Sequence, residues 1–334
     1  MATPNMSELK ATLKVAVLMG GPSAEHEISL KSGCGVVEAL SRLGWEAKGL
    51  VIPKSVTSED ALAATRLMLQ REASDVVFIA LHGPFGEDGT VQELCEELHV
   101  AYTGSNAQAS QLGMDKVASR LRFVQEGLHV PAWQMVEATQ HDLGSTLRSV
   151  PLPAVVKPTN QGSSVGISIV RTAEELKAAV TYAATFDHRV LIEQFIAGRE
   201  LTVGILEHEA LPVVEIQSSR SFFDYTAKYT PGLTRYVVPA DLDQALATQI
   251  QRAGLRAHHA LGCQHFSRID LLLNEEARPI ILEANTIPGL TMTSLLPKAA
   301  ASVGIAYETL CERVILMAVQ RRRAEEPVGS LQTR

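Results

Sequence analysis

The stretch KVAVLMGGPSAEHEISL (residues 14–30) sets the expected fold of the first part of the chain. It opens with six mostly apolar residues, which is typical of a short buried strand, and Gly20 and Gly21 end that strand. Apolar residues then recur from Ile28 to Leu40 at the spacing of one helix face. We therefore predict a strand that leads directly into a helix, which is the first half of a βαβ unit.

The same alternation continues along the chain. Further strands are predicted at 47–52 and 76–81, and further helices near 59–72 and 90–98. Strands that alternate with helices form a parallel sheet with right-handed crossovers. Residues 14–105 are thus expected to form one α/β domain with a Rossmann-like parallel sheet.

Residues 106–196 are expected to form a central lobe of a different kind. There the strand AVVKP (154–158) leads into the loop QGSSVGI and returns as a strand at 166–170, which is the pattern of an antiparallel hairpin. A third lobe is expected at 197–322. The remaining predicted segments are flexible tails at 1–13 and 323–334, helices at 113–127, 172–184 and 243–261, and strands at 189–195, 200–206, 212–216, 267–273 and 279–284.

Composition excludes several classes of protein. Of the 334 residues, 46% are hydrophobic and 20% are charged, so the chain is neither disordered nor collagen-like. Thirty basic residues against 37 acidic ones give a net charge of −7. This balance lacks the broad positive field of a nucleic-acid-binding protein, although it leaves room for a local cationic pocket.

The cysteines and the apolar runs indicate the compartment. The 4 cysteines lie far apart and form no C-x-x-C pair, which argues against a thiolate zinc site or a disulfide scaffold. The first residues contain no apolar signal segment, and runs such as VVFIAL (76–81) are far shorter than the roughly 20 residues that span a bilayer. We expect a reduced, soluble, cytoplasmic protein with no nucleic-acid or membrane partner.

Polar residues alternate along two predicted strands near the C-terminus. Arg268 and Asp270 lie two apart on one strand, and Glu283 and Asn285 lie two apart on the other, so each pair shares one face. If the strands pair, Asp270, Glu283 and Asn285 converge as the oxygen ligands that Mg²⁺ prefers. The alternative is a solvated strand face with a salt bridge to Arg268.

The loop GSSVG (162–166) follows Lys157 by five residues. Small residues let backbone N–H groups approach phosphate oxygens closely, and Lys157 adds a positive charge. An ordinary hairpin turn would explain the loop as well. The chain matches neither G-x-G-x-x-G nor G-x-x-x-x-G-K-[ST], so a dinucleotide site and a Walker-type loop are not supported.

Two further candidates follow strands of the first domain. Glu25 comes after the strand at 14–19, and His82 comes after the strand at 76–81. Open α/β sheets place ligands at the carboxyl ends of their strands, so a carboxylate and an imidazole there would suit a small substrate with an ammonium group. Glu25 could instead offset a helix dipole, and His82 could be a core histidine.

Together, these blocks resemble one family. LMGGPSAEHEISL, ALHGPFGEDGTVQ, YTGS, MDK, VVKPTNQGSSVG, DYTAKY, RID and LEANTIPGLTMTSLLPKAA follow one another from about residue 14 to 315. In this order they are similar to D-alanine–D-alanine ligases of the ATP-grasp superfamily. The resemblance implies an ATP-grasp fold and the ATP-dependent joining of two D-alanines through an acyl phosphate, for peptidoglycan precursors. It also implies two Mg²⁺ ions, with Mn²⁺ as a substitute, and a homodimer.

The resemblance further implies roles for individual residues. Glu25 would anchor the ammonium group of the first D-alanine, with His82 near its carboxylate. Arg268 and the backbone N–H of Gly289 would stabilise the oxyanion and the acyl phosphate. The implied metal ligands are Asp270, Glu283 and Asn285. The implied ATP contacts are Lys116, Lys157, Ser163, Ser164, Glu193, Phe195, Ile196, Glu200 and Lys228, and the implied contacts to the second D-alanine carboxylate are Ser294 and Leu295.

Residues 218–236 correspond to a loop that is expected to close over the site. Lys228 would reach the γ-phosphate of ATP, and Tyr229 would lock against Ser163 and Glu25. The segment SFFDYTAKYTPG is dense in aromatic residues in a chain that averages 5%, which favours a covering role over a plain exposed loop.

Two other functions remain open at this point. A D-alanine–D-lactate or D-alanine–D-serine ligase would share all of the ATP machinery, and the pair Lys228-Tyr229 favours D-alanine. An inactive nucleotide-binding or scaffold protein on the same fold would lack a metal ligand or Arg268, and none of these is lost.

Overall fold

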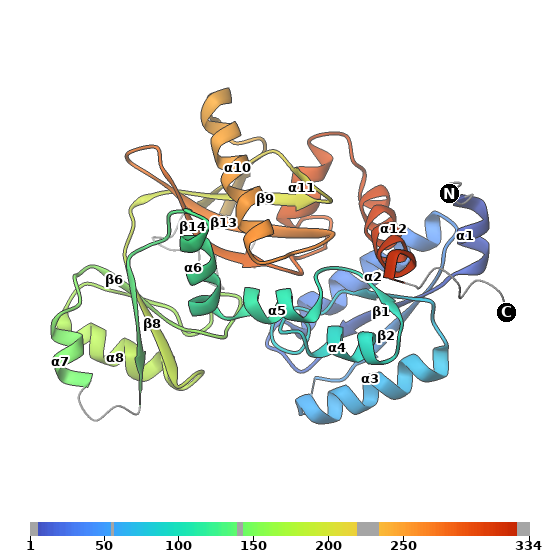
Figure 1. Ribbon diagram of the computed structural model, residues 1–334, viewed down its shortest axis with the longest axis horizontal. Helices are drawn as coiled ribbons and strands as arrows, with labels where there is room; N and C mark the ends of the chain where they lie inside the picture. The colour runs from blue at the N-terminus through green and yellow to red at the C-terminus, as the bar shows by residue number, and fades with distance from the viewer. Residues whose placement is uncertain (1–5, 55–56, 139–142, 219–233, 326–334) are drawn as a thin grey trace.

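The computed structural model describes residues 6–54, 57–138, 143–218 and 234–325. It confirms the predicted α/β class, because a parallel sheet and two antiparallel sheets are each covered by helices. In Figure 1 the parallel sheet lies at the lower right, one antiparallel sheet at the lower left and the other at the top. Helices α5 and α6 run between these parts.

The first sheet has the strand order β2-β1-β3-β4, and every neighbouring pair is parallel. Alternation of strand and helix along the chain therefore produced the predicted topology. Its strands are β1 (Lys14–Gly20), β2 (Glu46–Ile52), β3 (Val76–Ile79) and β4 (Ala101–Tyr102), and its helices are α2 (His26–Arg42), α3 (Ser58–Glu72) and α4 (Thr90–Glu97).

A glycine ends β1 for a steric reason. Gly20 has φ +87°, and a Cβ there would lie 2.5 Å from the carbonyl oxygen of Ile52 on the neighbouring strand. A side chain is therefore excluded, and the chain turns across the carboxyl end of the sheet. The turn carries Glu25 to this edge, immediately before α2.

The central sheet is antiparallel and has the strand order β5-β8-β6-β7. The pairing of β6 with β7 confirms the predicted hairpin around the Gly-Ser loop. The strands are β5 (Trp133–Glu137), β6 (Ala154–Pro158), β7 (Ser168–Val170) and β8 (Arg189–Gln194), and the accompanying helices are α7 (Leu143–Arg148) and α8 (Ala173–Ala183).

The third sheet has the strand order β12-β11-β9-β13-β14, and β10 pairs with β9. All of its pairs are antiparallel. The strands are β9 (Gly198–Leu206), β10 (Glu209–Ala210), β11 (Val214–Ser218), β12 (Thr234–Val237), β13 (Phe266–Asn274) and β14 (Pro279–Asn285), and the helices beside it are α10 (Gln244–Ala260) and α11 (Leu295–Ala301).

The single helix predicted at 113–127 is wrong, because two helices occupy this region. They are α5 (Ala107–Met114) and α6 (Lys116–Gln125). Asp115 separates them with an extended ψ of 104°, and its Oδ1 accepts hydrogen bonds from the backbone N–H groups of Val117 (2.9 Å) and Ala118 (3.0 Å). This N-cap starts a new helix at Lys116.

The tail predicted at 1–13 is partly wrong as well. Residues 6–12 form α1 (Met6–Thr12), and Leu9 is only 5% exposed because it packs into the core of the first sheet. At the other end, α12 (Tyr307–Glu325) runs past the predicted boundary at 322.

Helix α12 belongs structurally to the first sheet, although it follows the third in sequence. Its residues Leu310, Val314 and Ala318 are fully buried in a core that also contains Val17 of β1 and Phe78 of β3. Figure 1 shows α12 beside α2. The C-terminal helix therefore fastens the third part of the chain to the first.

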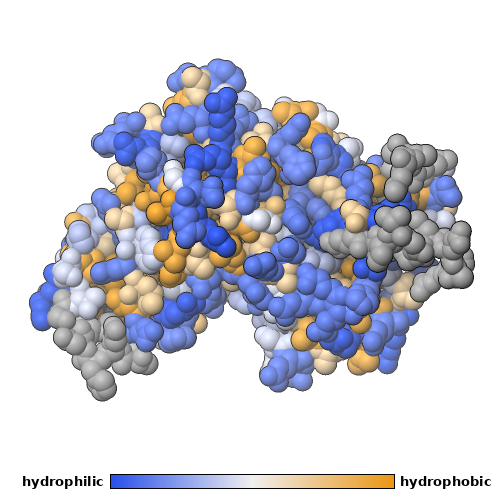
Figure 2. Space-filling model, viewed as in Figure 1, coloured by the Kyte–Doolittle hydropathy of each residue, from blue (hydrophilic) through white to orange (hydrophobic). Residues whose placement is uncertain are grey.

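The surface is mainly polar. Figure 2 shows hydrophilic residues over most of one face, and the outline recedes between the lobe with α7 and α8 and the lobe with α3. Among the described helices, none is long and apolar enough to cross a bilayer.

Candidate active site

The proposed metal ligands lie on two paired strands. Strands β13 and β14 are antiparallel, with Asp270 directly opposite Glu283 and Arg268 directly opposite Asn285. The pairing on which the sequence argument depended is therefore present. The Nδ2 of Asn285 donates to Oδ2 of Asp270 over 3.0 Å, which brings the amide and the carboxylate together.

These donors suit a hard cation. Within the described residues, no group of three or more His, Cys, Asp or Glu is placed to hold a metal by itself. Two carboxylates and one amide oxygen leave room for further oxygen ligands, which is typical of a site completed by water and nucleotide phosphates.

Arg268 holds Asp270 in a two-pronged ion pair. Its Nε lies 2.8 Å from Oδ1 and its Nη2 lies 2.7 Å from Oδ2 of Asp270. The hydroxyl of Thr202 on β9 also donates to Oδ1, over 2.7 Å. The carboxylate is thus fixed from two sides, and the guanidinium lies directly beside one of the predicted metal ligands.

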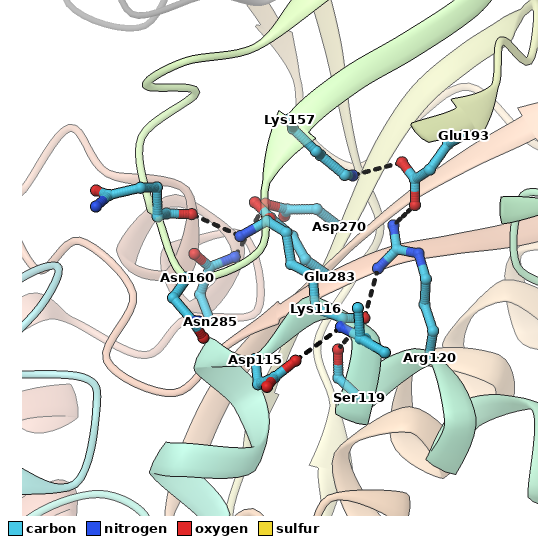
Figure 3. A network of polar contacts seen from close by, with 12 residues as sticks. Asp115, Lys116, Ser119, Arg120, Lys157, Asn160, Glu193, Asp270, Glu283 and Asn285 are labelled. Carbon is cyan, nitrogen blue, oxygen red and sulfur yellow. Dashed lines mark hydrogen bonds and ion pairs between the residues drawn. The ribbon is translucent and has the colours of Figure 1, made fainter. Parts of the chain in front are cut away.

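Two buried lysines face this point from neighbouring elements. Lys116, at the start of α6, is 5% exposed, and its Nζ lies 2.5 Å from the carbonyl oxygen of Gln161 and 3.6 Å from Oε2 of Glu283. Lys157, near the end of β6, lies 2.5 Å from Oε2 of Glu193 (Figure 3). Burial lowers the pKa of Lys157 to about 8, although Glu193 opposes this shift.

The Gly-Ser loop has an unusual backbone. Ser163 and Ser164 both lie in the left-handed region, with φ of 50° and 60°. Consecutive left-handed residues other than glycine are strained, and such strain concentrates at functional sites. The hydroxyl of Ser163 donates a short hydrogen bond to Oε1 of Glu25. The loop of the central lobe therefore meets the predicted ammonium anchor of the first domain.

A cleft of about 210 Å³ lies between the central and third sheets. Its walls are mainly apolar, and Lys157, Glu193 and Glu200 add polar groups. This combination suits a flat heterocycle with a polar edge, followed by a charged tail. The structure places the predicted ATP contacts Ser164, Phe195 and Ile196 in this cleft, and Asp270 and Glu283 also line it.

A second cavity, of about 730 Å³, lies where the first and third parts of the chain meet. It collects the predicted substrate residues at one place. They are Glu25, His82, Arg268, Gly289, Ser294 and Leu295, and the predicted ATP contact Ser163 lies with them.

His82 is held firmly in this cavity. Its ring contacts the hydroxyl of Ser32 (3.0 Å) and the carbonyl oxygen of Ile287 (3.2 Å), and its Nδ1 lies 3.6 Å from Oε1 of Glu87. Burial works against protonation, but Glu87 and Glu25 together raise the pKa of His82 above its ordinary value. The two carboxylates thus make protonation of this imidazole easier than burial alone would allow.

The segment with Gly289 closes the far side of the cavity. A Cβ at Gly289 would lie 2.9 Å from Oγ of Ser294, so a side chain there would displace the Ser294 hydroxyl. Ser294 is the N-cap of α11, and its Oγ accepts from the backbone N–H of Thr291 over 3.1 Å. Tyr307 fixes the segment from behind, because its hydroxyl donates to the carbonyl oxygen of Leu290 over 2.6 Å.

Some predictions lie outside the described residues. Lys228 and Tyr229 belong to the range 219–233, so the contacts predicted for them stay predictions. The two ends of the predicted lid at 218–236 are described, and they pair as β11 and β12, with Ser218 opposite Thr234.

Two residues of the site were missed by the sequence argument. Glu87 lies in the quoted block ALHGPFGEDGTVQ but was not singled out, and it lines the larger cavity beside His82. Arg120 is fully buried and forms an ion pair with Glu193. The spacing of Arg120 could have indicated its place near the site, because it lies one helical turn after Lys116 and so on the same face of the helix.

The fold defines an ATP-grasp enzyme, and its cleft between two antiparallel sheets lies beside the cavity that collects the predicted substrate residues. Residues 123–316 match the family described as "D-ala D-ala ligase C-terminus", and residues 53–105 match "D-ala D-ala ligase N-terminus". The chain belongs to the D-alanine–D-alanine ligase family.

Individual relatives agree with this assignment. A D-alanine–D-alanine ligase of Syntrophotalea carbinolica is 44% identical over 92% of this chain and 97% of its own length. A solved D-alanine–D-alanine ligase of Bacillus anthracis, complexed with ATP, has a TM-score of 0.80 at 30% identity and covers 94% of this chain and 100% of its own. The VanG D-Ala:D-Ser ligase of Enterococcus faecalis has a TM-score of 0.79 at 28% identity over 92% and 99%.

Proposed function

We propose that this enzyme joins two D-alanine molecules to D-alanyl-D-alanine while ATP is converted to ADP and phosphate. One observation carries the proposal: the nucleotide cleft and the substrate cavity meet on strand β13. Asp270 lines the cleft, and Arg268, two residues away on the same strand, lines the cavity. A γ-phosphate and a substrate carboxylate would therefore meet at these two side chains.

The reaction has two steps. A carboxylate oxygen of the first D-alanine attacks the γ-phosphorus, and the bond from phosphorus to the ADP oxygen breaks. The amine of the second D-alanine then attacks the carbonyl carbon of the acyl phosphate, and phosphate leaves. The amine nitrogen loses its surplus protons, and an amide bond remains.

The chain supplies charge and position for the first step. Lys116 and Lys157 neutralise phosphate oxygens, and Glu25 holds the ammonium group of the first D-alanine. The hydrogen bond from Ser163 to Glu25 ties this anchor to the phosphate loop, so both substrates are aligned by one contact.

The second step develops negative charge on the carbonyl oxygen. Arg268 and the backbone N–H of Gly289 stabilise this oxyanion and the departing phosphate. Ser294 and Leu295, at the start of α11, would bind the carboxylate of the second D-alanine. Water must be kept out, because an acyl phosphate hydrolyses readily.

A divalent cation fits the donor set of Asp270, Glu283 and Asn285, since all three side chains offer oxygen atoms on one face of paired strands. When bound, it would neutralise charge on the transferring phosphoryl group. We propose Mg²⁺, in two ions, with Mn²⁺ as a substitute. We also propose a cytoplasmic location, a homodimer, and three functional lobes at 14–105, 106–196 and 197–322.

The experiment is phosphate release from ATP with different acceptors, together with mass spectrometry of the product. D-alanine alone should give phosphate and the dipeptide in equal amounts, and L-alanine should give neither. Mixtures of D-alanine with D-serine or D-lactate distinguish the related ligases by the mass of the product. Absence of release that depends on D-alanine would overturn the proposal in favour of an inactive nucleotide-binding protein.

A further inference from the structure

Arg120 is a large polar side chain with no exposed surface. Arginine is almost never fully buried unless it is paired, so its partners matter. It lies on α6, one turn after Lys116, and its Nη1 donates to the carbonyl oxygen of Lys116 over 3.4 Å. It does not line the nucleotide cleft, and no role in the reaction falls to it.

The partner of Arg120 is Glu193 on β8, whose side chain is only 3% exposed (Figure 3). Arg120 contacts Oε1 of this carboxylate from one side, and Lys157 lies 2.5 Å from Oε2 on the other. The sheet explains the second contact: Glu193 is opposite Val155 on β6, and Lys157 stands two residues further along on the same face.

The arrangement keeps Glu193 ionised. Burial alone raises the pKa of a carboxyl group, but the charges of Arg120 and Lys157 outweigh burial and hold the pKa of Glu193 below its ordinary value. An ionised carboxylate only accepts hydrogen bonds. Oε1 is buried against Arg120, whereas Oε2 has a second lone pair beside Lys157 with which it can accept from a ligand in the cleft.

The cleft presents a hydrogen-bond acceptor and a hydrogen-bond donor, side by side, to one edge of its ligand. Glu193 offers an acceptor, and Lys157, beside it, offers a donor. The edge of adenine is complementary, because its exocyclic amino group donates and its neighbouring ring nitrogen accepts. Guanine carries a carbonyl oxygen in place of the amino group, and this oxygen would face a carboxylate that has no proton to donate.

We propose that Arg120 is a specificity-determining positioning residue. By holding Glu193 from behind, it keeps the carboxylate oriented and proton-free toward the cleft, and the enzyme thereby prefers adenine to guanine nucleotides. The inference rests on the proposed function, since it assumes a nucleotide in this cleft.

The test is calorimetric binding of ADP and GDP, in the presence of Mg²⁺, to the whole enzyme and its Arg120→Met variant. A hydrogen bond to a charged group is worth enough that its loss should weaken ADP binding roughly tenfold or more. GDP binding should change little, so the ratio of the two affinities falls. Arg120→Lys keeps a cation and should recover most of the ratio.

The matched control is Arg122→Met, because Arg122 lies on the same helix with an exposed side chain. It should leave both affinities unchanged. If Arg120→Met lowers the affinities for ADP and GDP by the same factor, Arg120 serves packing alone and the inference is wrong.

A double-mutant cycle keeps the test valid if Arg120→Met folds poorly. In a Glu193→Gln background, removal of Arg120 leaves no buried carboxylate unpaired. Arg120→Met should then change ADP affinity less than about twofold, because the effects of coupled residues are not additive. If Arg120→Met lowers ADP affinity in the Glu193→Gln background as much as it does in the unmodified enzyme, the inference is contradicted. Failure of the unmodified enzyme to bind ADP would instead refute the proposed function.

Discussion

Lys157 combines deep burial with a position on the nucleotide cleft. Its Nζ is paired with Glu193, while Arg120 and Lys116 repel its charge. Burial is the largest influence and brings the pKa of Lys157 down to about 8. The free enzyme therefore loses this charge just above neutral pH, whereas an exposed lysine keeps it to about pH 10.

We predict that ATP affinity falls as pH rises through about 8. Bound phosphate favours the charged lysine, so binding above this pH requires uptake of a proton. The dissociation constant should rise by up to about tenfold per pH unit between pH 8 and 9.5. Titrations of ATP at fixed pH, followed by calorimetry in buffers of different ionisation enthalpy, would measure both the affinity and the proton uptake.

Lys157→Gln is the control for this prediction. It should bind ATP more weakly at pH 7 and show no step near pH 8. A step that persists in the variant would assign the titration to another group.

Sequence reasoning reached some site residues and not others. Alternation along strands predicted that Asp270, Glu283 and Asn285 share one face, because the period of a strand is local and fixed. Glu193 was predicted only through the family resemblance, and nothing local beyond its spacing from Lys116 pointed to Arg120. The burial of Arg120 accompanies its ion pair with Glu193 on a distant element, and a single charged residue on a helix ordinarily faces solvent.

The turn between α8 and β8 supports both ends of the Gly-Ser loop. Asp187 accepts hydrogen bonds from the hydroxyl of Thr159 (2.6 Å) and from the backbone N–H (3.1 Å) and side-chain Nδ2 (3.0 Å) of Asn160. At the other end, a Cβ on Gly166 would lie 2.8 Å from the ring of Phe186. The loop that we propose to bind phosphate is therefore held at both ends by a turn outside the proposed site.

We predict that Asp187→Ala loosens this loop. The KM for ATP should rise roughly threefold to tenfold, because small displacements of positioning groups are costly. Hydrogen exchange of the amides at 161–165 should accelerate in the same variant. Glu174→Ala, at an exposed position of α8, is the matched control. Unchanged exchange in Asp187→Ala would mean that the loop is held by other contacts.

Elements were predicted best where the pattern is local. The hairpin of β6 and β7 followed from its glycine-rich loop between two apolar strands, and the observed pairing confirms it. The break between α5 and α6 was missed, although Asp favours an N-cap over a helix interior and Asp115 could have indicated it. Its side chain caps α6 in the structure, and Arg189 pairs with it over 2.8 Å.

At the scale of the whole molecule, Arg321 joins parts of the chain that are distant in sequence. From α12 it donates to the carbonyl oxygens of Tyr102 (2.7 Å) and Gly104 (2.8 Å) and to Oε1 of Gln264 (2.8 Å). Its guanidinium also stacks on the ring of Tyr102 at 4.1 Å. One side chain thus links the first sheet, the C-terminal helix and the segment before β13.

We predict that Arg321→Met lowers the free energy of unfolding by about 3 kcal/mol, from lost charged hydrogen bonds and a lost cation–π contact. The Tm should fall by several degrees in a calorimetric scan. Arg323→Met, at an exposed position two residues further along α12, should have no measurable effect. If the two variants lower the Tm equally, Arg321 does not stabilise the protein by linking these parts of the chain.

The overall architecture was predicted in its parts more than in its assembly. The sequence predicted three regions with different strand patterns, but it did not predict that α12 packs against the first sheet. The apolar face of a helix shows that it is buried and not which core it joins. Net charge was similarly uninformative. A total of −7 conceals the cluster of Lys116, Lys157 and Arg268 around the proposed phosphate site.

The central claim is that the substrate carboxylate becomes an acyl phosphate where Asp270 and Arg268 meet. D-alanine labelled with oxygen-18 in its carboxylate tests it most directly, because the oxygen that attacks phosphorus leaves with the phosphate. Turnover with ATP should give inorganic phosphate that carries a single oxygen-18 for each dipeptide formed, as seen by the phosphorus-31 isotope shift. Dipeptide formed with unlabelled phosphate would contradict the account.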